Sequence, residues 1–418
     1  MAPNAAPHER SLMNAPLPFA ALSPVRAADL AALPMIEKWI SFASVSRDSN
    51  LNLIEWTCEQ LQALGVQCTL THDDSGKKAN LWATLPAENG ETKTGGLVLS
   101  GHTDVVPVDG QPWDTDPFVA QIKGDKLYGR GVTDMKGFGA TALFMVPELL
   151  KRKLKRPVHL AFSYDEEVGC IGVRRLIAQM VDEGYRPSGC IVGEPTGMQV
   201  VIAHKGKHGY KTSVRGFEAH SSLTPQGVNA VEVACEFVTK LKSMHRKLES
   251  EGPFDPKFDV PFTTIHTGVI TGGTALNIIP RDCDVVWEIR HHHLNSPVVL
   301  FNEAKVFADN LVPAMQAVAP DTGITHTQTS VLPGFSTDAD SELAQLCFRC
   351  AGVDATSGAG KVSFGTEAAL FHQVGVSTIV CGPGHIAQAH QPNEWVSLAQ
   401  LAWCESFMRK LADEICVN

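Results

Sequence analysis

A histidine and two carboxylates follow apolar runs early in the chain. His102 and Asp104 stand in Ser-Gly-His-Thr-Asp, directly after the apolar run Leu97–Leu99, and Asp134 stands in the glycine-rich segment 129–137. Because side chains alternate along a strand, His102 and Asp104 are predicted on one face just beyond a buried strand. A carboxylate so placed can hold one imidazole nitrogen and leave the other free for a metal ion. A capped strand end with a hydrogen-bonded histidine would show the same short pattern.

Two further acidic segments also follow apolar runs. Asp165, Glu166 and Glu167 are consecutive, and Glu194 precedes Pro195 in Gly-Glu-Pro-Thr. Three adjacent acids repel one another unless a cation lies among them, so the triplet indicates a cation site. A solvated acidic turn is the alternative interpretation of the triplet.

A Gly-Pro-Gly loop near the C-terminus carries two more histidines. Gly384 belongs to this loop, and His385 and His390 follow it. Since the chain contains sixteen histidines, one of these two can be a solvated bystander.

The candidate metal ligands come from five loops. They are His102, Asp134, Glu167, Glu194 and His390. Imidazole and carboxylate donors without thiolate suit Zn²⁺, Co²⁺ or Mn²⁺ in a catalytic site with open positions. Five ligands exceed the needs of one tetrahedral zinc, and one carboxylate can bridge two ions roughly 3.5–4 Å apart. The set therefore predicts a dinuclear centre.

These residues are predicted at the carboxyl ends of strands in a layered α/β domain, where ligands gather in such folds. Strand-like runs span 79–85, 96–100, 158–163, 190–193 and 377–381, and helical runs span 28–42, 53–64, 137–150, 172–183, 341–351 and 399–415.

A second, smaller domain is predicted within the first. The order strand, helix, two strands, helix, strand over 208–332 predicts an inserted α+β domain of ferredoxin-like type. The larger mixed-sheet domain is then discontinuous, over 28–207 and 333–418. Residues 1–27 are rich in alanine and proline without a signal-peptide core, so we expect a loosely ordered tail.

Composition narrows the class of protein. A net charge of −10 argues against a nucleic-acid-binding face. No stretch reaches the ~20 apolar residues of a membrane span. Eleven scattered cysteines form no disulfide framework, which favours reduced thiols and a cytoplasmic location.

The motifs together resemble the co-catalytic zinc aminoacylase/carboxypeptidase family of metallopeptidases. The shared segments are HxD, GRGxxDMKG, the DEE triplet, GEPT and the late histidine, and the resemblance covers nearly everything after about residue 28. Narrower segments, Ala-His-Lys-Gly at 203–206 and Gly-Pro-Gly at 382–384 running to Ala-His-Gln-Pro-Asn-Glu at 389–394, are similar to the branch that hydrolyses N²-acetyl-L-ornithine in arginine biosynthesis.

The resemblance implies two divalent ions, Zn or Co, in the catalytic domain. Asp134 would bridge them, His102 and Glu194 would bind one, and Glu167 and His390 would bind the other.

The resemblance also implies the proton chemistry. Asp104 would orient His102, and a metal-activated water would attack the acyl carbonyl with Glu166 as general base. His220 would reach the active site of a partner subunit and stabilise the oxyanion, which implies a homodimer formed through the inserted lid domain. From the residues alone, His220 reads as a helix-capping or surface histidine.

Five further residues match substrate-contacting positions of the family: Asn277, Arg290, Gly365, Thr366 and Gly384. Arg290 suits a bidentate grip on the substrate α-carboxylate. A salt bridge at a strand end is the alternative for Arg290.

We therefore expect a metal-dependent hydrolase of small N-acyl amino acids, which converts N²-acetyl-L-ornithine to L-ornithine and acetate. The alternatives are an N-succinyl-diaminopimelate desuccinylase, a broader N-acyl-amino-acid amidohydrolase or dipeptidase, and a catalytically silent binding protein. The order of strands and glycines does not fit a nucleotide-binding oxidoreductase, because no GxGxxG opens a helix near an N-terminal strand.

Overall fold

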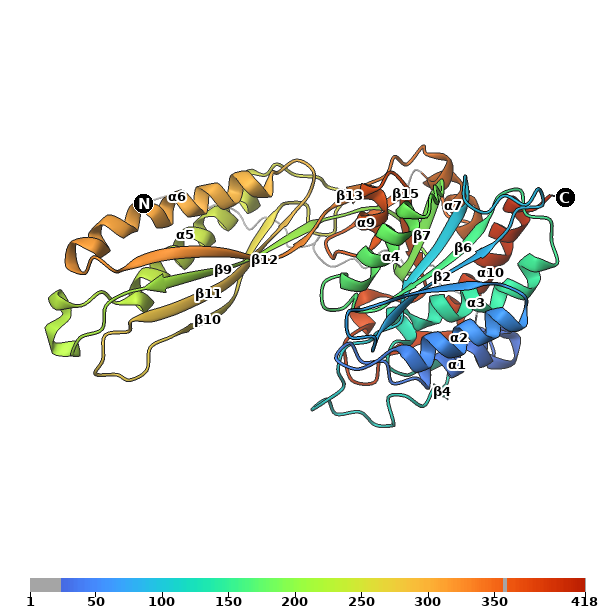
Figure 1. Cartoon of the computed structure of the whole chain (residues 1–418), viewed down its shortest axis with the longest axis horizontal. Coiled ribbons are helices and arrows are strands. Elements are labelled where there is room, and N and C mark those ends of the chain that lie inside the picture. The colour runs from blue at the N-terminus through green and yellow to red at the C-terminus, as the bar shows by residue number, and fades with distance from the viewer. Residues whose placement is uncertain (1–23, 356–358, 418) are drawn as a thin grey trace, which may run out of the picture. The chain divides into compact units, whose positions relative to one another are not determined.

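The computed structural model describes residues 24–355 and 359–417, so residues 1–23 of the predicted tail lie outside the description. The described residues form two compact units (Figure 1). The first holds 24–203, 336–355, 359–361 and 366–417, and the second holds 204–335 and 362–365. The second unit thus takes in 204–207, 333–335 and 362–365, which the sequence assigned to the larger domain. Lys205 N–H donates to the carbonyl of Val362 at 3.2 Å, which joins 362–365 to the smaller unit.

A mixed sheet of nine described strands forms the first unit, in the order β1-β2-β6-β3-β7-β15-β8-β13, with β14 paired to β8. The strands are β1 (Cys68–His72), β2 (Ala79–Leu85), β3 (Leu97–His102), β6 (Val158–Ser163), β7 (Gly189–Pro195), β8 (Val200–His204), β13 (Phe335–Ser336), β14 (Ala359–Val362) and β15 (Ser377–Gly382). β3 pairs in parallel with both β6 and β7, and all of its residues are buried. The mixed α/β layering predicted from the sequence is confirmed.

Helices cover both faces of this sheet. They are α1 (Leu33–Ile40), α2 (Leu51–Ala63), α3 (Gly137–Leu150), α4 (Ile171–Asp182), α7 (Glu342–Ala351), α9 (Ala368–Gln373) and α10 (Leu398–Ile415). From β3 the chain crosses through α3 to β6 on one side, and from β6 it crosses through α4 to β7 on the other side. Since parallel crossovers are right-handed, α3 and α4 lie on opposite faces. Ligands of α/β sheets bind where the strand order reverses in this way, which here is at the carboxyl end of β3.

Several local features escaped the sequence prediction. The helix expected over 28–42 is divided into a short turn, η1 (Ala27–Asp29), and α1, which starts with Pro34 in its first turn. Proline lacks the N–H that a continuous helix would need there. A three-stranded sheet of β4 (Gln121–Lys123), β5 (Lys126–Tyr128) and β16 (Trp395–Ser397) was also missed in the described chain. Strands of this length show too little alternation to be recognised.

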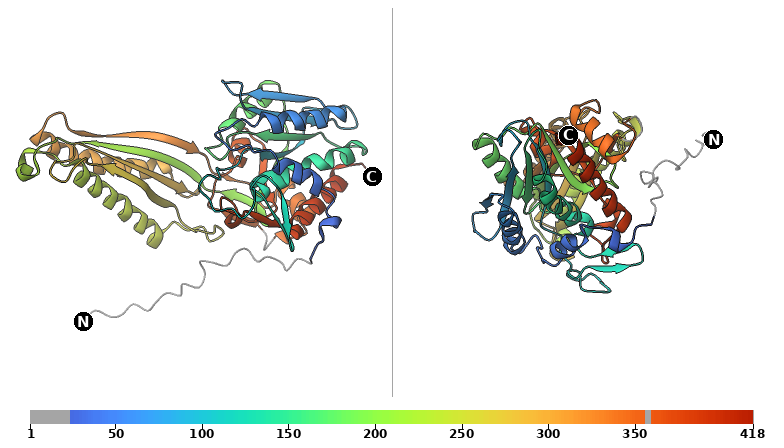
Figure 2. Two further views of the ribbon diagram at one scale, coloured as in Figure 1. Left: turned by 90° about the horizontal axis from the view of Figure 1, so that it is seen from below. Right: turned by 90° about the vertical axis from the view of Figure 1, so that its right-hand side faces the viewer.

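The second unit has the strand and helix order predicted from the sequence. Its described elements are β9 (Gly206–Arg215), η3 (Ser221–Gln226), α5 (Ala230–Glu251), β10 (Thr264–Gly272), β11 (Asp282–His291), α6 (Pro297–Val318) and β12 (Gly323–Leu332). The four strands form an antiparallel sheet in the order β10-β11-β9-β12. Both helices lie on one face of this sheet (Figure 2), over a core that contains Phe237 and Trp287.

The chain leaves and re-enters the first unit at neighbouring points. Thr337 N–H donates to the carbonyl of Ile202 at 2.8 Å, so the residues on either side of the insertion are hydrogen-bonded to each other. All eleven cysteines fall within the described residues and are free thiols. Among the helices of the described residues, none has the length and apolarity needed to cross a membrane.

Candidate metal centre

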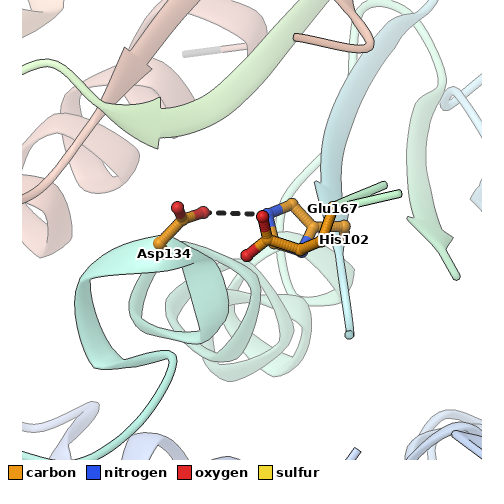
Figure 3. Close-up of side chains that lie close together, drawn as sticks. All are labelled: His102, Asp134 and Glu167. Carbon is orange, nitrogen blue, oxygen red and sulfur yellow. Dashed lines mark hydrogen bonds and ion pairs between the residues drawn. The ribbon is translucent and has the colours of Figure 1, made fainter. Parts of the chain in front are cut away.

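His102 ends the central strand β3 and is almost fully buried. Its Nδ1 lies 2.8 Å from the backbone carbonyl of Asp104. A carbonyl only accepts hydrogen bonds, so Nδ1 carries the proton and donates it, and Nε2 is left as the ligand nitrogen. That Nε2 lies 2.9 Å from Oδ1 of Asp134 (Figure 3).

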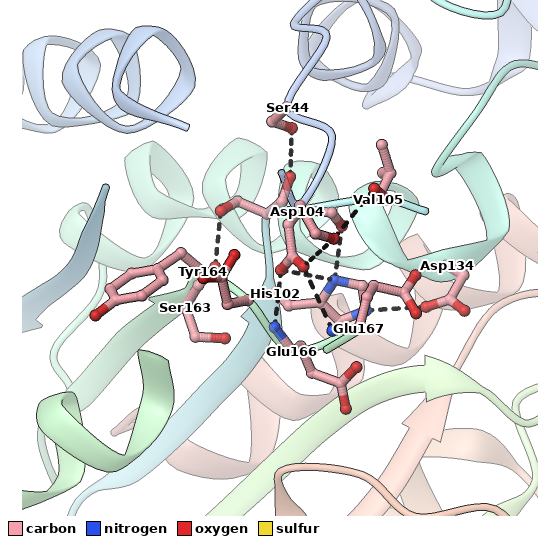
Figure 4. Close-up of polar contacts among 12 residues, drawn as sticks. Ser44, His102, Asp104, Val105, Asp134, Ser163, Tyr164, Glu166 and Glu167 are labelled. Carbon is pink, nitrogen blue, oxygen red and sulfur yellow. Dashed lines mark hydrogen bonds and ion pairs between the residues drawn. The ribbon is translucent and has the colours of Figure 1, made fainter. Parts of the chain in front are cut away.

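The Asp104 carboxylate contacts the acidic segment more closely than it contacts the imidazole. It accepts hydrogen bonds from the backbone N–H groups of Glu166 at 3.1 Å and Glu167 at 3.4 Å (Figure 4). It also accepts a hydrogen bond from the Ser46 hydroxyl at 2.7 Å. Its Oδ1 is 3.6 Å from Nδ1 of His102. The backbone carbonyl therefore orients His102, while the carboxylate fixes the residues that follow β6.

Asp134 faces two imidazoles at once. It lies in the distorted turn η2 (Val132–Lys136), which Gly131 opens with a left-handed φ of 83° and in which Asp134 itself is not helical. The Oδ1 atom points to His102, and Oδ2 lies 3.2 Å from Nε2 of His390. A carboxylate whose two oxygens serve two different nitrogens has the geometry of a bridging ligand.

The acidic triplet turns sharply after β6. Asp165 has a left-handed φ of 54°, and Nζ of Lys78 holds its carboxylate at 2.6 Å. The turn directs Glu167 toward His390, whose Nε2 lies 3.1 Å from Oε2 of Glu167. Glu166, the predicted base, lies in the same turn, between Asp165 and Glu167.

Glu194 completes the set from β7, where it is buried and its Oε1 lies 3.6 Å from Nε2 of His102. Candidate ligand atoms of His102, Asp134 and Glu167 lie within 4.8 Å of one another, and so do those of His102, Glu166 and Glu194. The structure thus brings together all five predicted ligands, with the predicted base beside them.

The crowded carboxylates hold protons more tightly than exposed acids do. Burial raises the pKa of Glu166 to about 8; Glu167 and Asp134 add to the rise, and His102 opposes it. Burial and the charge of Asp134 raise the pKa of Glu167 to about 7. Burial and Asp134 also raise the pKa of Glu194 well above its usual value.

The pKa values of the two imidazoles are also raised, and there the rise favours the charged form. Hydrogen bonds to Asp134 and Glu167 raise the pKa of His390 to about 10. Burial alone would lower the pKa of His102, but Asp134 and Glu194 raise it well above the ordinary value. Burial would raise the pKa of Asp134, yet the hydrogen bonds from both histidines lower it. The pocket therefore concentrates negative charge that only bound protons or a cation can neutralise.

This donor set fits divalent metal ions. Two imidazoles and three carboxylates bring ligand atoms close to one another, which suits zinc, cobalt or manganese. A thiol also contacts the site: Cys170 donates to Oε1 of Glu166 at 3.1 Å, and burial raises the pKa of this thiol well above the usual value. A protonated thiol is not a ligand, so the donors are nitrogen and oxygen alone.

Two predicted substrate residues lie in the first unit. Gly384 has a φ of 85°, and a Cβ there would lie 2.8 Å from the side chain of Thr133, next to Asp134. Thr366 is fully buried, and its hydroxyl accepts the N–H of Ala368 at the start of α9. Their contact with substrate stays a prediction.

The other predicted residues lie in the second unit. His220 is exposed and its Nδ1 lies 2.8 Å from the Ser222 hydroxyl, at the start of η3. Asn277 is exposed in the loop before β11. Arg290 donates through Nε to Glu288 at 2.7 Å, the strand-end salt bridge that the sequence left open. Gly365 packs against Leu332. Their roles toward a substrate also stay predictions.

Sequence reasoning missed the residues that support the site. Ser46 and Lys78 lie far from every motif in the sequence, and each contacts an acidic residue of the site. Serine and lysine in such segments carry no pattern that marks them, so only the folded chain reveals them.

Comparisons with known proteins show which family the chain belongs to. The profile of the peptidase family M20/M25/M40 matches residues 98–414. The chain belongs to this family. It is 33% identical over 389 residues to an acetylornithine deacetylase of Yersinia pseudotuberculosis serotype O:1b (strain IP 31758), an alignment that covers 93% of this chain and 96% of the relative. It is 32% identical over 370 residues to an acetylornithine deacetylase of Proteus mirabilis (strain HI4320), covering 88% and 91%.

Solved structures of peptidases share the fold. The aminopeptidase PepT of Bacillus cereus ATCC 10987 superposes with a TM-score of 0.71 at 18% identity, covering 92% of this chain and 98% of that one. The Bacillus subtilis YXEP protein, a dinuclear metal-binding peptidase from the M20 family, gives a TM-score of 0.66 at 12% identity, covering 92% and 97%. This M20/M25/M40 member is a metal-dependent hydrolase that acts on amide bonds and uses divalent metal.

Proposed function

We propose that the enzyme hydrolyses N²-acetyl-L-ornithine to L-ornithine and acetate. The observation that carries the proposal is Asp134, whose two carboxylate oxygens face His102 and His390 at 2.9 and 3.2 Å. The substrate follows from the relatives, because acetylornithine deacetylases align with 93% of this chain. A homodimer formed through the second unit is part of the proposal.

The metal centre is proposed to hold two ions, zinc or cobalt. Asp134 would contact both, His102 and Glu194 would hold one, and Glu167 and His390 the other. When bound, such ions lower the pKa of water and polarise an acyl carbonyl. The grouping of His102, Asp134, Glu167 and Glu194, with His390 in contact with Asp134 and Glu167, supports the assignment.

Glu166 moves the proton. Its carboxylate accepts a proton from the attacking water and delivers it to the departing amine, so that acetate and the free amino group leave the site. A pKa raised by burial suits a group that must both accept and release a proton near neutral pH. The Asp104 carboxylate accepts a hydrogen bond of 3.1 Å from the backbone N–H of Glu166 and so fixes the backbone from which the Glu166 side chain extends.

The second unit supplies substrate contacts in this proposal. His220 of the partner subunit would stabilise the oxyanion, and Asn277 and Arg290 would bind the substrate, with Arg290 on its α-carboxylate. In the first unit and in the 362–365 segment, Thr366, Gly384 and Gly365 would line the pocket through backbone groups. The exposure of His220 and the guanidinium of Arg290 are compatible with these roles.

The deciding experiment is a parallel assay of purified, metal-loaded enzyme. N²-acetyl-L-ornithine, N-succinyl-diaminopimelate, a panel of N-acetyl amino acids and dipeptides are compared by kcat/KM. We expect the highest value for N²-acetyl-L-ornithine. A higher value for any other substrate would overturn the substrate assignment while leaving the amide hydrolase intact.

The base is tested with Glu166→Gln. We expect kcat to fall by roughly 10²–10⁴-fold with both metal ions retained. Glu405→Gln is the matched control. Glu405 is a buried acid on α10, outside the proposed ligand set, and its carboxylate accepts a hydrogen bond of 3.1 Å from the Ala32 N–H. Full activity of Glu166→Gln would remove it from the mechanism.

A further inference from the structure

A buried carboxylate outside the predicted ligand set lies behind the metal pocket. Glu394 follows His390 on the loop that leads into β16, and it is 1% exposed. The pairing of β16 with β5, in which Trp395 lies opposite Tyr128, brings this loop beside the glycine-rich segment of Asp134. Glu394 belongs to neither group of candidate ligand atoms, and the mechanism above does not use it.

Its carboxylate accepts hydrogen bonds from the turn that carries Asp134. Oε1 accepts the backbone N–H groups of Thr133 at 2.9 Å and Asp134 at 3.2 Å, and Oε2 accepts the N–H of Gly131 at 3.1 Å. The backbone of η2 is irregular, so these N–H groups have no helical carbonyl to bind. Glu394 supplies their acceptor.

A guanidinium completes the arrangement and connects it to the second histidine. NH1 of Arg130 donates to Oε2 of Glu394 at 2.8 Å, and NH2 donates to the side-chain oxygen of Gln111. The side-chain amide of Gln111 in turn donates to the carbonyl of His390 at 3.0 Å. One network therefore holds the backbone of both Asp134 and His390.

We propose that Glu394 is a positioning residue that sets the separation of Asp134 and His390, and so determines how tightly the metal pocket binds its ions. The proposal rests on the metal assignment made above. The pocket gathers four carboxylates that repel one another, and their ligand geometry must be held before an ion arrives. Glu394 meets that need because it is a buried acceptor with four donors and its loop also carries His390. Neither the turn of Asp134 nor this loop can shift without breaking hydrogen bonds to Glu394.

Glu394→Gln tests this directly. The amide keeps one oxygen acceptor but turns an NH₂ group toward donors, so at least one side of the network is lost. In the metal-free protein titrated with Co²⁺ and followed by visible absorption, we expect affinity for the more weakly bound ion to fall by about 10–100-fold, with a changed spectrum. Glu405→Gln is the matched control, because its carboxylate also accepts a backbone N–H and an arginine, from Ala32 and Arg409. It should titrate like the unsubstituted protein.

A milder variant covers the case in which Glu394→Gln does not fold. Gln111→Ala leaves Glu394 in place and removes the half-buried connection between Arg130 and the carbonyl of His390, together with the acceptor of the Trp113 indole N–H. We expect weaker binding of the ion at the His390 side, and a spectrum changed in the same direction. Co²⁺ affinities within twofold of the unsubstituted protein in the folded variants, with unchanged spectra, would overturn the proposal.

Two ligand variants separate this inference from the proposed function. Asp134→Ala and His390→Ala should each lose metal. If they bind Co²⁺ as the unsubstituted protein does, the metal assignment fails, and the role of Glu394 fails with it. If they lose metal while Glu394→Gln and Gln111→Ala do not, the metal assignment holds and only the positioning role is wrong.

Discussion

At the scale of single residues, Asp104 shows how one side chain takes a different role from the one its motif suggests. The HxD spacing predicted a carboxylate bound to the imidazole, yet the backbone carbonyl of Asp104 holds His102 and the carboxylate holds the N–H groups of Glu166 and Glu167. The motif predicted the right residues, but sequence spacing cannot tell a carbonyl contact from a carboxylate contact.

We expect Asp104→Asn to lower kcat by about 10–100-fold, because the amide cannot accept from both N–H groups and the Ser46 hydroxyl. His102 keeps its carbonyl partner, so the ion on its side should remain. Steady-state kinetics and metal content by mass spectrometry measure the two effects. Loss of the ion together with activity would instead favour the contact between carboxylate and imidazole.

The raised carboxyl pKa values predict how metal binding depends on pH. Glu166 and Glu167, with pKa values of about 8 and 7 before metal binds, hold protons at neutral pH. An ion must displace the proton of its proposed ligand Glu167, and its charge disfavours the proton on the neighbouring Glu166. Affinity therefore rises as pH increases, by roughly tenfold per pH unit for each proton displaced. His390, with a pKa of about 10, must also lose a proton before it binds an ion, so it makes metal affinity rise with pH as well. Chelator competition at pH 6, 7 and 8 measures the slope, and a flat profile would contradict the prediction.

At the scale of elements, the strands that lead into the proposed ligands were predictable from the sequence. The short strands that hold the neighbouring loops in place were not. β3, β6 and β7 are apolar runs that stop at a polar motif, so their ends could be read from the sequence. β5 and β16 have only three residues each, and Glu394 beside them resembles any acid in a loop. Long-range pairing between such segments decides the shape of the pocket, and no local pattern encodes it.

Close packing beneath the ligand strand gives a prediction about stability. Gly193 precedes Glu194 on β7, and a Cβ there would lie 1.9 Å from the ring of Phe138, which is fully buried in α3. We expect Gly193→Ala to lower the free energy of unfolding by about 1–3 kcal/mol, since the ring must move in a packed core. Urea denaturation measures the change.

Adding Phe138→Leu to Gly193→Ala should restore part of the loss by making room for the methyl group. Gly323→Ala is the control, because its Cβ would meet no atom within 4 Å. Equal stabilities of Gly193→Ala and Gly323→Ala would show that the packing at β7 is looser than described.

At the scale of the whole molecule, the two units have separate cores. The core of the second unit is centred on Trp287, whose ring stacks on Tyr210 with centroids 4.8 Å apart and whose indole N–H donates to Thr212 at 2.9 Å. Its strand and helix order was predictable because each element alternates or repeats regularly. Its boundaries were not, because Val362–Gly365 joins it from a distant part of the sequence.

We expect residues 204–335 expressed alone to fold cooperatively. Trp287 is the single tryptophan of this segment, so its fluorescence and near-ultraviolet circular dichroism report on this core. A blue-shifted emission and a sigmoidal thermal transition are the expected results, and Trp287→Phe assigns the signal. Red-shifted emission without a transition would mean that the segment needs the rest of the chain.

The hydrogen bond between Ile202 and Thr337 has a consequence for the history of the chain. A module whose two ends meet side by side can be gained, exchanged or lost at one surface point without rethreading the host sheet. Every proposed metal ligand lies in the host, whereas the proposed α-carboxylate contact Arg290 lies in the insert. Selection can therefore alter what the enzyme accepts by rewriting the insert while the hydrolytic centre stays unchanged.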